Sequence, residues 1–160
     1  MAKNKEIKTN AMRILDRMKI PYSHYTYACD EFVDGISVAD MLSLPHEKVY
    51  KTLVAQGASK EYYVFVIPIE AELDLKKAAR AVGEKSVSMI HVKEINAVTG
   101  YVRGGCTAVG MKKQYRTIID QSAQGLPSMI VSGGRIGSQI ELEPEDLRRA
   151  AEASFEDVTG

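Results

Sequence analysis

The run Val49-Tyr-Lys-Thr-Leu-Val-Ala-Gln56 and the later run Tyr62-Tyr-Val-Phe-Val-Ile-Pro68 carry the strongest fold signal in the chain. Both are rich in β-branched and aromatic residues, and the intervening Gly57-Ala-Ser-Lys-Glu61 has the composition of a hairpin loop. We therefore expect two paired antiparallel strands. Lys51 stands out, because an unpaired ammonium buried in an apolar strand costs several kcal/mol. Its head either reaches water from an exposed face of the strand or is held at a site that uses the charge.

Helix-start and helix-stop signals place the other elements around this hairpin. Thr9 is a predicted N-cap for a helix that Pro21 ends, and Asp74 is a predicted N-cap for a helix over 75–82 that Gly83 ends. The segment 37–40 has the form of a capping box, with Asp in place of Glu. Further strands are predicted at 22–27, 86–91, 116–120, 128–132 and 139–142, and further helices at 94–98 and 144–153.

These elements predict one compact α/β domain of the α+β kind, covering residues 1–160. Strands and helices are mixed without a regular βαβ alternation, which favours a largely non-parallel sheet. The sequence contains no internal repeat, linker or low-complexity segment. A chain of 160 residues is long enough to bury a single sizeable core.

Composition limits the class of protein and of partner. Lys plus Arg number 21 and Asp plus Glu number 21, so no overall charge favours nucleic acid, and we expect free RNA to bind weakly through a local patch. There are only two cysteines, and neither a signal-like apolar terminus nor a run long enough for a membrane span. We expect a soluble cytoplasmic protein without membrane attachment. Candidate members of the basic patch are Lys76, Lys77, Arg80, Lys112, Lys113 and Arg116.

Two glycine-rich segments could line a pocket. Gly100, Gly104, Gly105 and Gly110 are too dense for a strand interior and would let the backbone approach a ligand closely. Ordinary tight turns explain the same glycines, but a second cluster at Ser132-Gly-Gly134 favours a shared cleft. The spacing fits neither the mononucleotide-binding nor the dinucleotide-binding glycine motif.

Cys106 lies beside two of these glycines and could be imagined as a nucleophile, with His24, His46 or His91 as its base. No local motif matches a cysteine hydrolase, so a plain structural thiol is favoured. The cysteines and histidines also lack the spacing of zinc ligands. We expect neither a metal nor an organic cofactor.

Three motifs together resemble the YbaK/EbsC family of aminoacyl-tRNA editing domains, which hydrolyse wrongly aminoacylated tRNA. They are Val49-Tyr-Lys-Thr-Leu53, then Thr99-Gly-Tyr-Val-Arg-Gly-Gly-Cys-Thr-Ala-Val-Gly110 with Met-Lys-Lys after it, and Val131-Ser-Gly-Gly134. The resemblance covers essentially the whole chain. It implies the fold of the domain associated with prolyl-tRNA synthetase, a barrel-like, mixed and mostly antiparallel sheet of six to seven strands surrounded by helices.

The resemblance also assigns roles to residues. It implies that Lys51 contacts phosphate or sugar oxygens of the terminal adenosine, and that the backbone N–H groups of Gly104 and Gly105 face the ester carbonyl. The implied substrate-binding residues are Tyr27, Thr52, Cys106, Ser132 and Gly133. Two departures from the family pattern concern the pocket: the glycine loop lacks the proline found in many members, and Gln139 stands where members often carry an acidic residue.

The function that this resemblance implies is hydrolysis of Cys-tRNA(Pro) by a free-standing deacylase, with the thiol of the bound cysteine attacking its own ester. Prolyl-tRNA synthetase would be the partner that helps to hold the tRNA. Two alternatives stay open. The enzyme could act on alanyl or another small aminoacyl ester, or the chain could be a non-catalytic module that binds tRNA ends or a regulatory partner.

Overall fold

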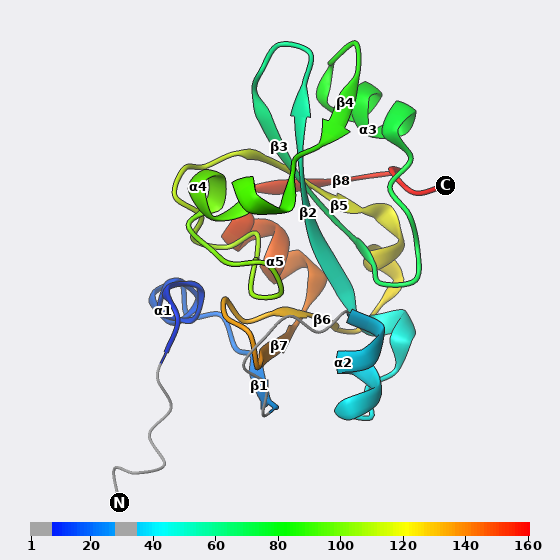
Figure 1. Ribbon diagram of the computed structural model, residues 1–160. Coiled ribbons are helices and arrows are strands. Elements are labelled where there is room, and N and C mark those ends of the chain that lie inside the picture. Colours follow the sequence, from blue (N-terminus) through cyan, green and yellow to red (C-terminus); the bar gives the residue numbers. More distant parts are fainter. Residues whose placement is uncertain (1–7, 28–34) are drawn as a thin grey trace, which may run out of the picture.

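The computed structural model describes residues 8–27 and 35–160. Within them the chain forms five α-helices around two separate sheets (Figure 1). The helices are α1 (Asn10–Arg17), α2 (Gly35–Met41), α3 (Leu75–Val82), α4 (Ile95–Thr99) and α5 (Pro144–Ala151). The strands are β1 (Ser23–Thr26), β2 (Tyr50–Gly57), β3 (Tyr62–Pro68), β4 (Val87–Met89), β5 (Arg116–Asp120), β6 (Met129–Ser132), β7 (Ser138–Leu142) and β8 (Ala153–Glu156). Short 3₁₀ helices lie at His46–Lys48, Val92–Glu94 and Gln121–Gly125.

The predicted hairpin is confirmed and forms the centre of the larger sheet. β2 and β3 pair antiparallel, from Tyr50 opposite Pro68 to Gln56 opposite Tyr62. β4 pairs with β2 on the other side, while β5 and then β8 extend the sheet beyond β3 in parallel. Residues 64–67 of β3 are all fully buried, which explains why this strand is apolar at every position instead of alternating.

The smaller sheet has the strand order β1-β7-β6 and is antiparallel throughout. The barrel-like single sheet of six to seven strands predicted above is therefore wrong in its closure, because the described strands number eight and form two open sheets. Strand β8 takes the free edge of β5, and one isolated bridge between Val49 and Ile130 links β2 to β6. The prediction of mostly antiparallel pairing is confirmed, since β3–β5 and β5–β8 are the only parallel pairs among the described strands.

Two predicted helix boundaries are confirmed by their caps. The hydroxyl of Thr9 accepts a hydrogen bond from the Met12 N–H at 3.2 Å, and the Asp74 carboxylate accepts from Lys76 and Lys77 N–H at 3.0 and 3.1 Å. Gly83 ends α3 with φ +74°, the left-handed conformation that glycine adopts without strain.

Two other boundaries differ from the prediction. The segment 37–40 lies inside α2, so the predicted capping box is wrong. Helix α5 ends at Ala151 because Glu152 adopts φ +53°, and Ala153 begins β8 where the helix was expected to continue. This strand was missed because Ala-Ser-Phe-Glu is short and lacks an apolar pattern.

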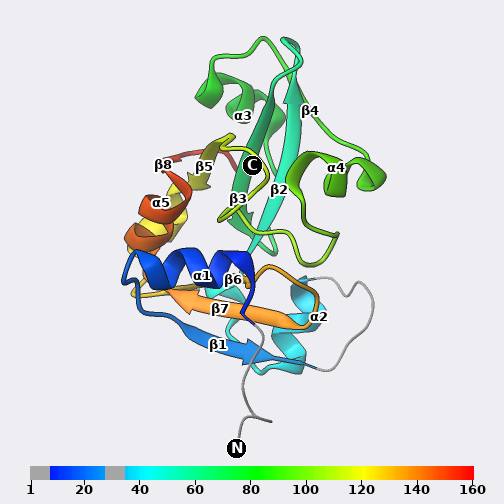
Figure 2. The ribbon, with the colours of Figure 1, turned by 90° about the vertical axis from the view of Figure 1, so that its left-hand side faces the viewer.

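Helices cover each sheet. α1 lies along β6 and β7 (Figure 2), and its fully buried Met12 and Leu15 share one apolar cluster with Val131 and Ile140. α3 packs through Ala78 and Val82 in a second cluster that belongs to the larger sheet. Within the described residues, no helix has the length and apolar character needed to cross a bilayer.

Candidate functional site

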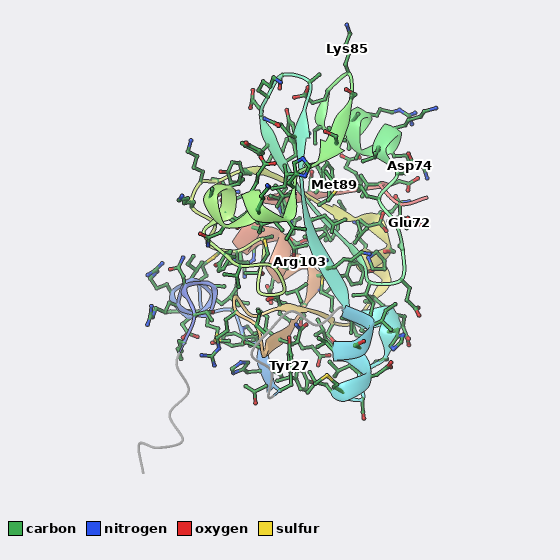
Figure 3. The ribbon with its side chains drawn as sticks, viewed as in Figure 1. Tyr27, Glu72, Asp74, Lys85, Met89 and Arg103 are labelled. Atoms are coloured by element: carbon green, nitrogen blue, oxygen red, sulfur yellow. The ribbon has the colours of Figure 1, made fainter. Side chains whose placement is uncertain are left out.

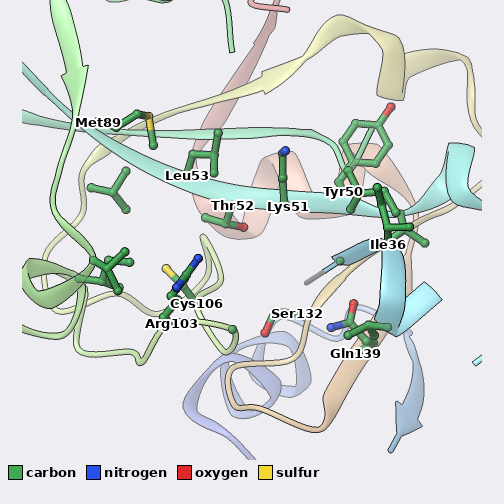
Figure 4. Close-up of a pocket in the computed structure, with 18 of the residues that line it drawn as sticks. Ile36, Tyr50, Lys51, Thr52, Leu53, Met89, Arg103, Cys106, Ser132 and Gln139 are labelled. Atoms are coloured by element: carbon green, nitrogen blue, oxygen red, sulfur yellow. The ribbon is translucent and has the colours of Figure 1, made fainter. Parts of the chain in front are cut away.

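A cavity of about 610 Å³ lies beside β2, bordered by α2, the segment that follows β4, the glycine loop 100–110 and the ends of β6 and β7 (Figure 4). This volume falls within the range of roughly 300–1,000 Å³ that is typical of ligand pockets. Figure 3 shows that Tyr27, Met89 and Arg103, which all line it, come from three separate parts of the fold. Its apolar lining consists of Ile36, Val38, Val49, Leu53, Val54, Ile69, Met89, Ile90, Val92 and Ile95.

The cavity exists because one edge of β2 is open. β4 pairs only with residues 55–57 of β2, and at the other end Val49 bridges to Ile130. The Val54 carbonyl accepts from the Ile90 N–H at 3.3 Å, so the backbone polar groups of Val54 point away from β3. The backbone N–H and C=O groups of successive residues in a strand point alternately to its two sides. Those of Thr52, two residues before Val54, therefore also point to the open edge. A ligand in the cavity can reach both groups.

Side chains from both faces of β2 border this open edge. Lys51 and Leu53 project from one face and Thr52 projects from the other, toward Cys106 and Arg103 (Figure 4). The cavity thus extends around the strand edge. A ligand could therefore contact Lys51 on one side of β2 and the glycine loop on the other.

A tight turn shapes the glycine loop. The Gly105 N–H donates to the Val102 carbonyl at 2.9 Å, which closes a β-turn over residues 102–105. Gly104 occupies the third position with φ +88°, as a type II turn requires, and this is a conformation that favours glycine. Arg103 is placed at the corner of the turn, where its exposed side chain borders the cavity.

The two glycine-rich segments touch each other. A Cβ built on Gly105 would lie 2.6 Å from the Cα of Arg135, in the turn between β6 and β7. Gly133 has equally little room, because its Cβ would lie 2.3 Å from the Ser138 hydroxyl oxygen. Since Gly104 and Ser132 both line the cavity, the two segments form the shared cleft that the sequence favours.

Hydrogen bonds from the start of α1 hold both glycine-rich segments in place. The Thr9 hydroxyl donates to the Gly133 carbonyl at 2.5 Å, and the side-chain amide of Asn10 donates to the Gly110 carbonyl at 3.1 Å. The Tyr101 hydroxyl, which donates to the Val109 carbonyl at 2.6 Å, holds the loop from inside. The sequence identified Thr9 only as a helix cap. Contacts across about a hundred residues have no local signature.

Six of the eight site residues predicted from the sequence line this cavity. They are Tyr27, Lys51, Thr52, Gly104, Cys106 and Ser132. Gly105 and Gly133 lie behind its wall. The Gly105 N–H already closes the turn, so the prediction that it faces an ester carbonyl is not supported, and both glycines instead permit close packing of the loops.

Two cations and one amide supply much of the polarity of the cavity. None of the described lining residues is Asp, Glu or His, whereas Lys51 and Arg103 carry positive charge. Lys51 is half-buried, and within the described residues its ammonium has no hydrogen bond or ion pair. Gln139 is 7 % exposed, points its amide into the cavity (Figure 4) and has no hydrogen-bond partner for that amide among the same residues.

Cys106 lines the cavity as a neutral thiol. Burial raises its pKa to about 11, although a hydrogen bond with Thr99 acts in the opposite direction. A thiol needs its thiolate form to be a strong nucleophile, so this environment disfavours attack by Cys106. Cys29 lies outside the described residues, among which no three His, Cys, Asp or Glu side chains are grouped as metal ligands would be.

The basic patch expected from the sequence is partly used within the protein. The Arg116 guanidinium donates to the Ala81 carbonyl at 3.1 Å, and the Lys112 ammonium donates to the Ala97 carbonyl at 2.9 Å. Lys77 forms an ion pair with Asp157 at 3.0 Å. These cations fix helix ends and the last residues of the chain, which leaves fewer of them for RNA.

Comparison with known proteins gives a consistent family. The sequence profile described as "Aminoacyl-tRNA editing domain" matches residues 34–150. EbsC of Enterococcus faecalis, which is named for a proposed Cys-tRNA(Pro)/Cys-tRNA(Cys) deacylase activity, is 45% identical over 161 aligned residues, covering 99% of this chain and 98% of EbsC.

Solved structures share the fold at lower identity. The crystal structure of the hypothetical protein APE2540 aligns with a TM-score of 0.85 at 20% identity, covering 95% of this chain and 100% of that one. A structure described as a proposed trans-editing enzyme for prolyl-tRNA synthetase aligns with a TM-score of 0.79 at 20% identity, covering 97% of this chain and 99% of that one.

Proposed function

Because the chain belongs to the aminoacyl-tRNA editing domain family, we propose that it is a free-standing deacylase that hydrolyses the ester bond of Cys-tRNA(Pro). The observation that carries this proposal is the cavity at the open edge of β2, where Lys51, Gly104 and Ser132 meet in a chain 45% identical to EbsC. The proposed editing domain spans residues 1–160. Its place of action would be the cytoplasm, where translation takes place.

Such an activity has a clear physical purpose. A synthetase pocket separates similar small amino acids by only about 1–3 kcal/mol, so accuracy is often completed at a second, hydrolytic site. A partly apolar cavity with an open strand edge can hold a small aminoacyl group and the nucleoside that carries it. Activity on an alanyl ester remains the alternative, because the glycine loop departs from the family pattern.

The pocket favours a nucleophile that comes with the substrate. No described lining residue is a carboxylate or a histidine that could serve as a general base, and Cys106 is held as a thiol. In the proposed step, the sulfur of the bound cysteine forms a bond to its own ester carbon, and the bond from that carbon to the ribose oxygen breaks. The thiol proton goes to this leaving oxygen, and water then opens the cyclic thioester. No cofactor is needed for this sequence.

The backbone of the glycine loop would stabilise the negative charge on the ester oxygen. Since the Gly105 N–H is engaged in the turn, the available donors are the N–H groups of Gly104 and Cys106, for which no acceptor exists among the described residues. The terminal nucleoside would lie across the edge of β2, with Lys51 against its phosphate or sugar oxygens. Tyr27, Thr52 and Ser132 would complete the walls.

Prolyl-tRNA synthetase is the partner that we propose for holding the rest of the tRNA. The chain has 21 cationic and 21 anionic side chains, and several of the cations are engaged internally. Phosphate contacts dominate affinity for nucleic acids, so free tRNA should bind weakly. A synthetase that already holds the tRNA body would remove this limitation.

Deacylation measured on tRNA(Pro) charged with Cys, Ala, Ser or Pro tests the proposal. We expect the Cys ester to be hydrolysed fastest, and Lys51→Ala to lower that rate at least about tenfold, which is about 1.4 kcal/mol of transition-state stabilisation. The melting temperature of the variant should stay near that of the wild type. Preference for the Ala ester would favour the alternative substrate, and inactivity on all four would favour a binding module.

A further inference from the structure

We propose that Arg103 binds a phosphate of the 3′ strand of the tRNA, on the glycine-loop side of the open β2 edge and separately from Lys51. This inference rests on the proposed function and adds a residue to its substrate-binding site. The family resemblance assigns no role to Arg103. The assignment comes from where the turn places the side chain and from the charges that the substrate can bring.

The fold presents Arg103 in a defined way. It occupies the corner of the turn over residues 102–105, which the Gly105 N–H closes at 2.9 Å and in which Gly104 has φ +88°. Its side chain is exposed, borders the cavity and reaches from the loop toward the β2 face that carries Thr52 (Figure 4). Packing of Gly105 against Arg135 fixes the base of the turn. A long cationic side chain is thus held at the cavity by a rigid backbone.

The chemistry of the substrate identifies the group that Arg103 would bind. In an aminoacyl ester the carboxylate charge is lost, and the amino group is neutral or positive. The phosphodiesters that lead to the terminal nucleoside are therefore the only anions near the reacting bond. A guanidinium presents a planar fork of donors that matches phosphate oxygens, which is why arginine is common in phosphate recognition.

The lining of the cavity supports the same assignment. Among the described lining residues none is Asp or Glu, and the charged side chains are those of Arg103 and Lys51, both cationic, in a chain whose formal charge is zero. Lys51 projects from the opposite face of β2 (Figure 4). The two cations would therefore contact the 3′ strand of the tRNA on different sides of the open β2 edge. Met89 and Val92, which line the same cavity, expose 44% and 52% of their surface and offer apolar contact to unpaired bases.

The decisive test uses two small esters: 3′-O-cysteinyl-adenosine and the same compound with a 5′-phosphate. Arg103→Ala should lower kcat/KM about tenfold or more on the phosphorylated ester and less than about twofold on the phosphate-free one, since a charged hydrogen bond is lost only in the first case. Arg103→Lys should recover part of the loss. Lys85→Ala, which removes an exposed cation outside both the cavity and the candidate basic patch, is the matched control and should change neither value.

Binding of the uncharged trinucleotide pCpCpA supplies a second measurement that does not depend on catalysis. For Arg103→Ala, the slope of log K against log salt should fall by about 0.7, the change expected for one phosphate contact to a single strand. Equal losses on both esters, or an unchanged salt slope, would overturn the assignment to phosphate. A wild-type protein that binds pCpCpA through Arg103 but cleaves no ester would instead contradict the proposed deacylase function alone.

Discussion

A Cβ on Gly105 would lie 2.6 Å from the Cα of Arg135, so the two loops at the cavity are in direct backbone contact. This contact sets the position of the turn that carries Gly104 and Arg103. An added methyl group meets backbone atoms that no side-chain rotation can move away. The proposed oxyanion donors and the proposed phosphate-binding residue therefore both depend on a glycine that does not line the cavity.

We predict that Gly105→Ala lowers deacylation of Cys-tRNA(Pro) more than tenfold and destabilises the protein by about 1–3 kcal/mol, the usual effect of overpacking. Gly125→Ala is the matched control, because nothing lies within 4 Å of its Cβ. Kinetic assays and urea unfolding of both variants check the prediction. Unchanged activity in Gly105→Ala would show that the loop contact does not position the catalytic backbone.

Gln139 should take part in substrate binding. Its amide points into the cavity and has no hydrogen-bond partner among the described residues, so it is available to a ligand. Gln139→Ala should therefore raise KM or lower kcat about tenfold, while the free energy of unfolding changes little or increases. Gln114→Ala provides a control, since the Gln114 amide instead donates to the Ala151 carbonyl at 2.9 Å and should affect only stability. Normal kinetics for Gln139→Ala would exclude a contact with substrate.

Local signals in the sequence predicted much of the fold. The β2–β3 hairpin and the α3 boundaries at Asp74 and Gly83 follow from residue pattern, turn composition and capping chemistry. Strand β8 and the open arrangement of the sheets could not be predicted in this way. They depend on which sheet edge a short, weakly patterned segment pairs with after Glu152, and that edge is β5. Which segment of the chain pairs with a free sheet edge cannot be read from the sequence of a four-residue strand.

The candidate site shows the same division. Lys51 and the glycine loop were found from motifs, yet the sequence did not distinguish Gly104, which lines the cavity, from Gly105, which packs behind it. The role of Arg103 depends on the turn that orients it. The contacts of Thr9 and Asn10 depend on α1 lying across both loops.

Glu141 should make stability depend on acid pH. Burial opposes its ionisation, but hydrogen bonds from Lys48 at 2.8 Å, from Ser128, and from Tyr25 at 2.6 Å outweigh this and lower its pKa from 4.5 to about 2. A carboxyl with a depressed pKa stabilises the fold above pH 4.5, and that contribution is lost as the pH falls toward 2.

We predict that Glu141→Gln is less stable than the wild type by about 1–2 kcal/mol at pH 6, and that the difference shrinks at pH 3. Urea unfolding at both values measures it. Glu143→Gln, which changes an exposed carboxylate two residues later, serves as the control. A difference for Glu141→Gln that is the same at both pH values would contradict the linkage.

Cys106 separates the two possible mechanisms of ester cleavage. Its raised pKa of about 11 keeps it protonated at neutral pH, whereas an ordinary unburied cysteine thiol has a pKa near 8.5. Cys106→Ser should keep most of the activity, and the rate of both proteins should rise with pH between about 7 and 8.5 as the substrate thiolate forms. A protein nucleophile would make this variant inactive.

The most direct test of the central claim is the deacylation rate of Cys106→Ser and of the wild type on tRNA(Pro) charged with Cys or with Ser. Substrate-assisted cleavage predicts that both proteins hydrolyse the Cys ester at least about tenfold faster than the Ser ester, because a hydroxyl is the poorer nucleophile. An inactive Cys106→Ser protein, an acyl adduct on Cys106 detected by mass spectrometry, or equal rates on the two esters would contradict the account.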